Sequence, residues 1–123
     1  MDRKALIRQY KESRRPMGVY RVHNTVNDKS LVGSGVEVQA MLNSHKARLR
    51  LGVHENAALQ KDWDMLGPEA FDFEVLDTLS PRDDPGYDPA ADLRELEALW
   101  MAKLSPFDQR GYNATSDRKR SKD

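Results

Sequence analysis

The sequence predicts a single domain of the α/β (α+β) class, in which a small three-stranded antiparallel sheet is flanked by helices. Two observations predict this fold. Short runs rich in β-branched and aromatic residues occur at 17–24, 29–34 and 71–79. Segments with apolar residues at helical spacing separate and follow these runs, at 37–51, 55–66 and 89–104. A chain of 123 residues is long enough for one domain with a modest core.

The chain begins with a predicted N-terminal helix over 1–15, where apolar and basic residues alternate at helical spacing. Pro16 ends this helix, because the residue before a proline avoids the helical conformation. The strands at 17–24 and 29–34 then form a hairpin. Residues 25–28 supply its turn, since Asn and Asp tolerate the left-handed conformation that tight turns need.

Two helices are predicted after the hairpin. The first covers 37–51 and ends at Gly52, a residue type common at helix C-termini. Its apolar stripe consists of Val38, Leu42 and Leu49. The second covers 55–66 and ends at Gly67, which a proline follows. The sequence therefore supplies two short helices to cover the sheet.

The third strand, at 71–79, shows the alternation of a half-buried strand. Phe71, Phe73, Val75 and Leu79 occupy odd positions, and polar residues lie between most of them. We therefore expect the odd positions to face the core and the even positions to face solvent.

A loop and a last helix complete the predicted domain. Residues 81–89 contain three prolines and a run of acids, which predicts a loop, and a helix is expected over 89–104. Residues 115–123 are polar and charged, which predicts a disordered tail. The domain itself is therefore expected to span 16–114.

The composition excludes several classes of site. The chain has no cysteine, so disulfides, thiolate catalysis and cysteine-ligated zinc are ruled out. No apolar run approaches the ~20 residues of a membrane helix, and residues 1–4 open no signal peptide. We therefore expect a cytoplasmic protein that does not enter a membrane.

Charge is segregated along a chain that is neutral overall. Residues 1–54 carry 11 basic and 4 acidic side chains, whereas residues 55–102 carry 3 basic and 13 acidic ones. A basic region of this kind is compatible with nucleic-acid binding. Sequence blocks need not form spatial faces, so an ordinary solvated surface is the alternative.

The functional signal lies in a series of short segments that the predicted elements place in order. The series consists of Gly18-Val19-Tyr20, Leu31-Val32-Gly33 followed by Ser34, His45, Gly52-Val53-His54, Glu97 with Trp100, and Gly111-Tyr112-Asn113. In this order the segments resemble the motifs of the GIY-YIG nuclease family, over roughly residues 16–114. The resemblance implies a three-stranded sheet with helices and phosphodiester hydrolysis on DNA.

The resemblance also implies site residues and a cofactor. Glu97 matches the glutamate that holds one divalent metal ion, Mg²⁺ or Mn²⁺, and Tyr20 matches the first-motif tyrosine that helps to activate water. His54 and Asn113 match positions near the phosphate. Such a division of roles suits the chemistry, because a metal absorbs developing negative charge and positioned donors surround the phosphate.

Two family residues are replaced in this chain. Leu31 stands where the second-motif tyrosine is expected, and Met41 where a helix arginine is expected, so a hydroxyl and a positive charge are missing. Arg48 lies on nearly the same helical azimuth as Met41, roughly 10 Å further along the axis, and is a partial substitute at best. Lys29 is a candidate for contact with backbone phosphates.

Each candidate has a structural alternative. Glu97 falls on the same helix face as Leu93 and Trp100, so it is either a functional carboxylate or an acid at the edge of the apolar stripe. His45 lies within an apolar stripe, which favours a core or supporting role. His54 follows a helix end, and by pattern it is less buried. Asn113 is alternatively a turn residue.

Three functions remain open from the sequence. The leading hypothesis is a metal-dependent DNA endonuclease with an atypical and impaired site. The second is a non-catalytic nucleic-acid-binding module that keeps the fold. The third is a protein-interaction domain that uses the acidic middle third of the chain.

Overall fold

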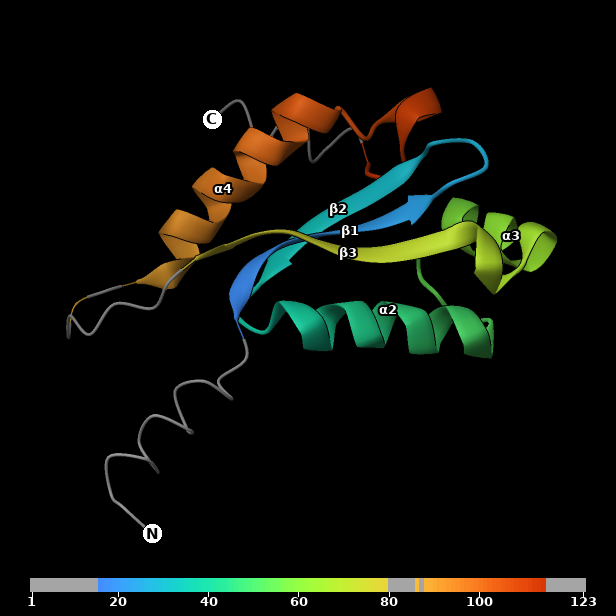
Figure 1. Ribbon diagram of the computed structural model, residues 1–123, viewed down its shortest axis with the longest axis horizontal. Helices are drawn as coiled ribbons and strands as arrows, with labels where there is room; N and C mark the ends of the chain where they lie inside the picture. Colours follow the sequence, from blue (N-terminus) through green and yellow to red (C-terminus); the bar gives the residue numbers. More distant parts are fainter. Residues whose placement is uncertain (1–15, 80–85, 87, 115–123) are drawn as a thin grey trace, which may run out of the picture.

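The computed structural model describes residues 16–79, 86 and 88–114 (Figure 1). The predicted helix over 1–15, most of the predicted loop and the tail over 115–123 lie outside this part of the chain. The described elements follow in the order β1 (Met17–Asn24), β2 (Ser30–Gly35), α2 (Val38–Leu51), α3 (Ala57–Leu66), η1 (Pro68–Ala70), β3 (Phe71–Leu79), α4 (Pro89–Leu104) and η2 (Asp108–Arg110). The predicted order of strands and helices over the described residues is confirmed.

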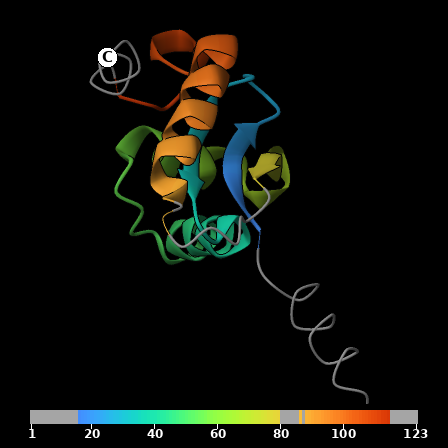
Figure 2. The same cartoon turned by 90° about the vertical axis from the view of Figure 1, so that its left-hand side faces the viewer.

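The three strands form one antiparallel sheet in the order β2-β1-β3. Helix α4 covers one face of the sheet, and α2 covers the other with α3 beside it (Figures 1 and 2). Strand β2 is an edge strand, so its outer backbone groups need partners from elsewhere. No helix in the described ranges is long and apolar enough to cross a lipid bilayer.

The turns form where the sequence predicts them. Asp28 adopts a positive φ of 65° in the hairpin turn, and the Asn24 side chain accepts a hydrogen bond from the backbone N–H of Val26. Gly52 ends α2 with a φ of 76°, and its N–H bonds to carbonyls of the last helical turn. Asn56 caps α3 by accepting a hydrogen bond from the backbone N–H of Leu59.

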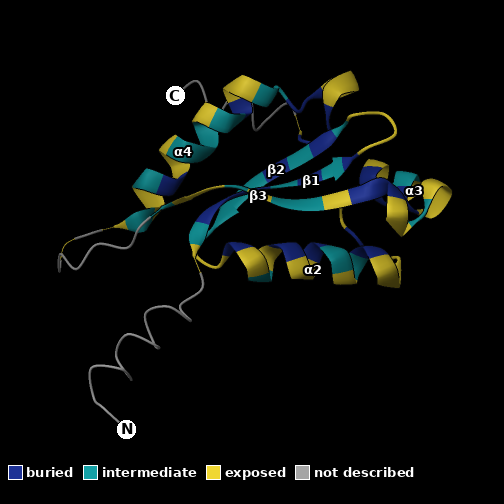
Figure 3. Ribbon diagram, in the orientation of Figure 1, coloured by how far each residue is buried: buried dark blue, intermediate teal, exposed yellow. Residues whose placement is uncertain are grey.

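The core consists of two apolar layers, one on each face of the sheet (Figure 3). The layer beneath α2 and α3 contains Val22, Leu42, Leu49, Leu59, Trp63 and Phe71. The layer beneath α4 contains Val19, Val32, Met101 and Phe107. Each helix buries the face that meets the sheet and exposes the other, as a surface helix of a globular domain does.

The alternation predicted for β3 is wrong at its centre. Val19 pairs with Asp77 and Tyr20 pairs with Val75, so Leu76 is an extra residue in a β-bulge. The extra residue shifts the side-chain alternation of β3 relative to β1. Asp77 consequently lies opposite Val19 on the α4 face, where Leu76 also packs, whereas Val75 stays opposite Tyr20 on the α2 face and is 41% exposed.

The packing of α2 predicts the outcome of a truncation experiment. Leu42→Ala removes a side chain that is 1% exposed, and we expect it to lower the free energy of unfolding by about 2–5 kcal/mol. Leu51→Ala, on the same helix, is the matched control because Leu51 is 76% exposed, and its effect should stay within about 0.5 kcal/mol. Urea denaturation measures both values. Equal effects would contradict the assigned burial.

Candidate active site

Tyr20 reaches from the central strand across the edge strand. Its side chain lies on the sheet face covered by α2, where it is 5% exposed. It pairs in register with Gly33 of β2. A Cβ atom on Gly33 would lie well under 3.0 Å from the Tyr20 hydroxyl, so the ring occupies the space that a side chain at position 33 would fill. The glycine therefore permits the tyrosine hydroxyl to reach the β2 edge.

A chain of hydrogen bonds connects Tyr20 to two histidines. Tyr20 Oη lies 2.8 Å from His45 Nε2, and His45 Nδ1 lies 2.8 Å from His54 Nε2. His45 extends the buried stripe of α2 toward the sheet. His54 is placed by the segment that joins α2 to α3, where its backbone N–H donates to Gln60 Oε1.

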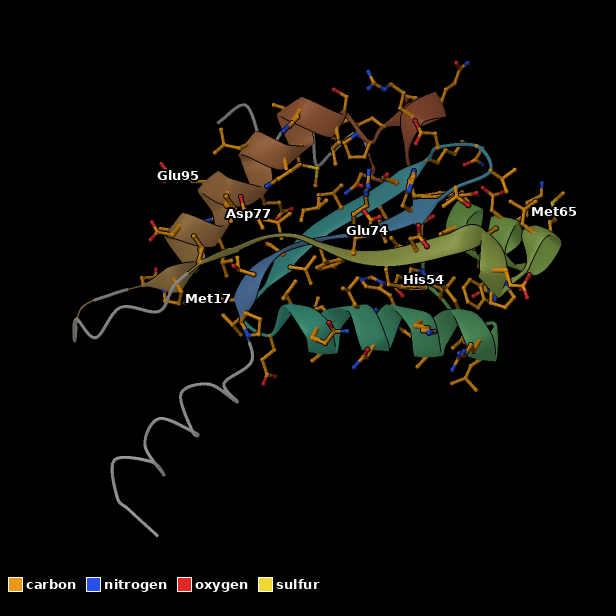
Figure 4. All side chains as sticks on the ribbon, viewed as in Figure 1. Met17, His54, Met65, Glu74, Asp77 and Glu95 are labelled. Carbon is orange, nitrogen blue, oxygen red and sulfur yellow. The ribbon has the colours of Figure 1, made fainter. Side chains whose placement is uncertain are left out.

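Both histidines are neutral at neutral pH. Burial is the largest cause that lowers the pKa of His45, to about 4, and the neighbouring Arg48 and His54 add to this effect. Burial also lowers the pKa of His54. His54, which the sequence predicts to be less buried than His45, is only slightly so, at 7% exposed against 5%. Its labelled side chain lies between the sheet and the helices beneath it (Figure 4).

Arg48 and Glu55 form an ion pair at the outer end of the histidine chain. Arg48 Nη2 also lies 3.3 Å from His45 Nδ1. Glu55 is mainly exposed, and bonds from its own backbone and from Arg48 hold the pKa of its carboxyl below the usual range. The guanidinium therefore supports the histidine pair and does not occupy the space beside Met41.

Glu97 reaches the same edge strand from the opposite side of the sheet. Its carboxylate accepts a hydrogen bond of 2.5 Å from the hydroxyl of Ser34 on β2. Glu95, two residues earlier, is exposed and points away from the sheet (Figure 4). The different orientations of these two acids confirm the helical-face assignment made from the sequence.

An electrostatic link joins the two sides of the strand. The pKa of Tyr20 rises to about 12, first because the phenol is buried and second because the Glu97 carboxylate is near enough to oppose its ionisation. Tyr20 is therefore a neutral phenol at neutral pH. A carboxylate and a phenol lie within electrostatic reach of one another at the β2 edge.

No family model and no curated protein matches the sequence. Two solved structures match the fold with a TM-score of 0.63 and 26% identity, and both belong to the catalytic domain of the intron, or homing, endonuclease I-TevI. One is a variant with a glutamate changed to alanine. It aligns with 80% of this chain and 92% of its own, and the other with 79% and 96%. The domain has a GIY-YIG-like fold.

Within the GIY-YIG-like fold, the two replaced positions have apolar surroundings. Leu31 lies opposite Val22 in the sheet and packs, half-buried, against the layer beneath α2. The Met41 side chain lies against Gly35 of β2 and is 37% exposed. Neither position supplies a hydroxyl or a charge to the β2 edge, as the sequence predicts.

Asn113 binds the edge strand itself. Its side-chain amide donates to the carbonyl of Val32 and accepts from the N–H of the same residue, both at 2.8 Å. A side chain thus supplies the partner that a further strand would otherwise provide. Contact between Asn113 and a phosphate stays a prediction, whereas its two bonds give it a clear role in fixing β2.

The structure does not bring Lys29 to the Tyr20 cluster. Its ammonium lies 5.8 Å from the ring centre of Tyr112, beside the hairpin turn. Tyr112 is tied there by hydrogen bonds with Asn24 and Asp62. A phosphate contact by Lys29 would therefore lie at the hairpin end of the sheet.

Sequence reasoning missed several supporting residues. Ser34 was noted within a motif but not as the partner of Glu97, although alternation along β2 places it on the α4 face. Asn56 is recognisable as a helix cap, yet its donation to the Tyr112 carbonyl is a long-range contact. Leu59-Gln60 also resembles a family segment, but the sequence does not indicate that Gln60 bonds both the His54 backbone and the Leu49 carbonyl.

The residues at the β2 edge fit a divalent metal. Glu97 and Ser34 offer oxygen atoms, which Mg²⁺ and Mn²⁺ prefer, and one carboxylate is sufficient for an ion that keeps most of its waters. A second group of possible ligand atoms comes from His45, His54 and Glu55. The positive charge of the Arg48 guanidinium, which lies beside that group, opposes the binding of a cation. In addition, nitrogen atoms of the two histidine rings already bond one another.

The contact between Tyr20 and Gly33 yields a test of the site geometry. Gly33→Ala should displace the phenol, break its bond to His45 and lower the free energy of unfolding by about 1–3 kcal/mol. Gly35→Ala is the control, because the one close approach of its Cβ would be to the flexible Met41 side chain, and the Glu37 backbone nitrogen is at ordinary contact distance. Urea denaturation and the NMR signals of His45 report the two effects. An unchanged His45 environment in Gly33→Ala would contradict the geometry.

Proposed function

We propose that this domain is a metal-dependent DNA endonuclease with an atypical, slow active site at the β2 edge. One observation carries the proposal. Glu97 and Tyr20 approach the same edge strand from opposite sheet faces, within a fold shared with the catalytic domain of a homing endonuclease. The substrate is DNA, by analogy with that endonuclease, and the ion is Mg²⁺ or Mn²⁺.

The proposal gives each residue a role that its position supports. Glu97 holds the metal ion, which neutralises charge that develops on the phosphate during hydrolysis. Ser34 orients the Glu97 carboxylate through their hydrogen bond. Tyr20, neutral and held by His45, contributes a hydroxyl near the attacking water. Asn113 fixes the strand along which these groups are arranged.

The missing groups set the expected rate. A preorganised donor to transition-state charge is typically worth ~10²–10³ in rate. Leu31 and Met41 remove two such groups, so we expect cleavage far slower than that of an efficient nuclease. His45, His54 and Arg48 form a supporting network and do not replace either lost group.

Removal of the metal-binding carboxylate tests the proposal directly. Glu97→Ala and Glu97→Gln should reduce cleavage of single- and double-stranded DNA in Mg²⁺ or Mn²⁺ by at least ~10²-fold, because the ion loses its protein ligand. Glu95→Ala, on the solvent side of the same helix, should cleave like the unchanged protein. Equal residual cleavage in the Glu97 variants and the unchanged protein would overturn the assignment.

Restoring the two missing groups provides a gain-of-function test. We expect Leu31→Tyr combined with Met41→Arg to raise the cleavage rate by ~10–10³-fold, since a hydroxyl and a cation return to the phosphate region. Leu31→Phe with Met41→Gln has similar side-chain sizes without these groups and should give no increase. Time courses on a labelled duplex measure both. A gain shared by the two double variants would point to packing instead.

A non-catalytic nucleic-acid-binding module is the second candidate. Leu31 and Met41 favour it, because their apolar side chains withdraw two groups used in phosphodiester chemistry. This function gives DNA binding that weakens steeply with salt and no turnover in any metal. Salt-sensitive binding without cleavage, unchanged in Glu97→Ala, would support it over the endonuclease.

A further inference from the structure

We propose that Asn56 and Arg48 are positioning residues that fix the protons of the histidine pair, so that Tyr20 receives a hydrogen bond and keeps its own proton for a group at the β2 edge. The catalytic role that this gives Tyr20 rests on the proposed function, whereas the arrangement of the protons does not depend on it.

The direction of the hydrogen bonds is set at the end of the chain farthest from Tyr20. The backbone N–H of Asn56 donates to His54 Nδ1 at 3.0 Å. A backbone N–H only donates, so Nδ1 of His54 is an acceptor and carries no proton. The ring is neutral, and its single proton therefore lies on Nε2, which faces His45. Asn56 is itself fixed as the α3 cap and by its bond to the Tyr112 carbonyl.

The same direction continues to His45, where the Arg48 contact gives it a second support. His54 Nε2 carries a proton, so His45 Nδ1 accepts it at 2.8 Å. Arg48 Nη2, which also only donates, lies 3.3 Å from the same His45 nitrogen. Two donors therefore converge on His45 Nδ1, and the proton of the neutral ring must lie on Nε2. His45 Nε2 then donates to Tyr20 Oη.

These proton positions determine how the Tyr20 hydroxyl is hydrogen-bonded. Among residues 16–79, 86 and 88–114, the Tyr20 hydroxyl has His45 as its one hydrogen-bond partner. It uses that bond as an acceptor, which leaves its own proton available to a water or a phosphate oxygen. Transfer of this proton to His45 would require both rings to move their proton from Nε2 to Nδ1. The bonds that Asn56 and Arg48 donate to the two Nδ1 atoms would then break. Tyr20 thus acts as a donor in the resting protein, with the histidines as its support.

The ion pair explains why Arg48 stays in place. Glu55 binds its guanidinium, and the Ser44 carbonyl accepts from its Nε at 3.3 Å. An arginine that is held twice keeps a fixed donor toward His45. Its hydrogen bond reaches Tyr20 only by way of His45, whereas its positive charge also acts on the phenol directly and lowers the pKa of Tyr20 against the larger effect of burial.

The proton positions are measurable by NMR on the full chain labelled with ¹⁵N-histidine, without DNA or metal. We expect His45 and His54 each to carry one proton on Nε2 and none on Nδ1. Tyr20→Phe should leave both rings in this form, because the direction is imposed from the Asn56 end. A proton on Nδ1 of either ring, or a switch in Tyr20→Phe, would overturn the proposal.

The role of Arg48 needs a readout beyond stability. Arg48→Met should shift the His45 Nδ1 resonance as one of its two donors is lost, and Arg48→Lys should restore most of that shift. Cleavage should fall about tenfold in kcat with KM unchanged in Arg48→Met, an effect typical of a lost charged hydrogen bond. An unshifted His45 resonance in Arg48→Met would refute its part. Absent cleavage in every variant would refute the proposed function alone, because the resonances need no turnover.

Discussion

The contact of Tyr20 with Gly33 is the constraint on which the candidate site depends. The phenol passes over an edge-strand residue that has no side chain, and so its hydroxyl lies at the strand edge while its ring stays in the core. Any Cβ at position 33 would expel the ring. His45 can bond the phenol only because Tyr20 is held over Gly33. Because Gly33 has no side chain, Tyr20 can extend from the apolar layer beneath α2 to the polar groups beside β2.

A buried polar chain has to be satisfied at each member, since an unpaired polar group inside a protein costs about 1–3 kcal/mol. The described residues meet this condition, because no buried side-chain nitrogen or oxygen among them lacks a partner. The chain from Asn56 through His54 and His45 to Tyr20 is one part of that network. Its members are neutral, which avoids the larger cost of burying a charge. The charged pair, Arg48 and Glu55, lies further out, where water reaches it.

Local sequence rules predict most of the fold because its elements are locally determined. The turn at 25–28, the stop at Gly52 and the stripe of α2 each follow from short-range chemistry. The bulge at Leu76 does not, because it arises from how β3 pairs with a strand about fifty residues earlier. Alternation within β3 alone would place Asp77 on the face of Phe73 and Val75, and the bulge places it opposite Val19 on the other face.

The candidate site also contains residues that local sequence predicts and residues that depend on long-range contacts. Tyr20, His45 and Glu97 are recognisable because each lies in a motif on a strand or helix of predictable orientation. The burial of His54 depends on its contact with Gln60 and on the path of the chain between two helices, and local sequence patterns predict neither of these. Asn113 is recognisable as a motif residue, but its bonds to Val32 form only when the C-terminal segment reaches the β2 edge.

The two departures from the motif pattern differ from the retained residues in what they do for the protein itself. Tyr20, His45 and Asn113 bond to other parts of the chain, so they contribute to folding as well as to any chemistry. A tyrosine at position 31 and an arginine at position 41 would each bring a polar group that this network does not need, and Leu31 packs well without one. Stability thus favours the retained set whether or not the site turns over.

For this reason the intact network at Tyr20 is no measure of activity, whereas Glu97 is more informative. Its bond to Ser34 at the strand edge places a carboxylate against the apolar layer beneath α4, where a purely structural requirement would be met as well by an apolar side chain.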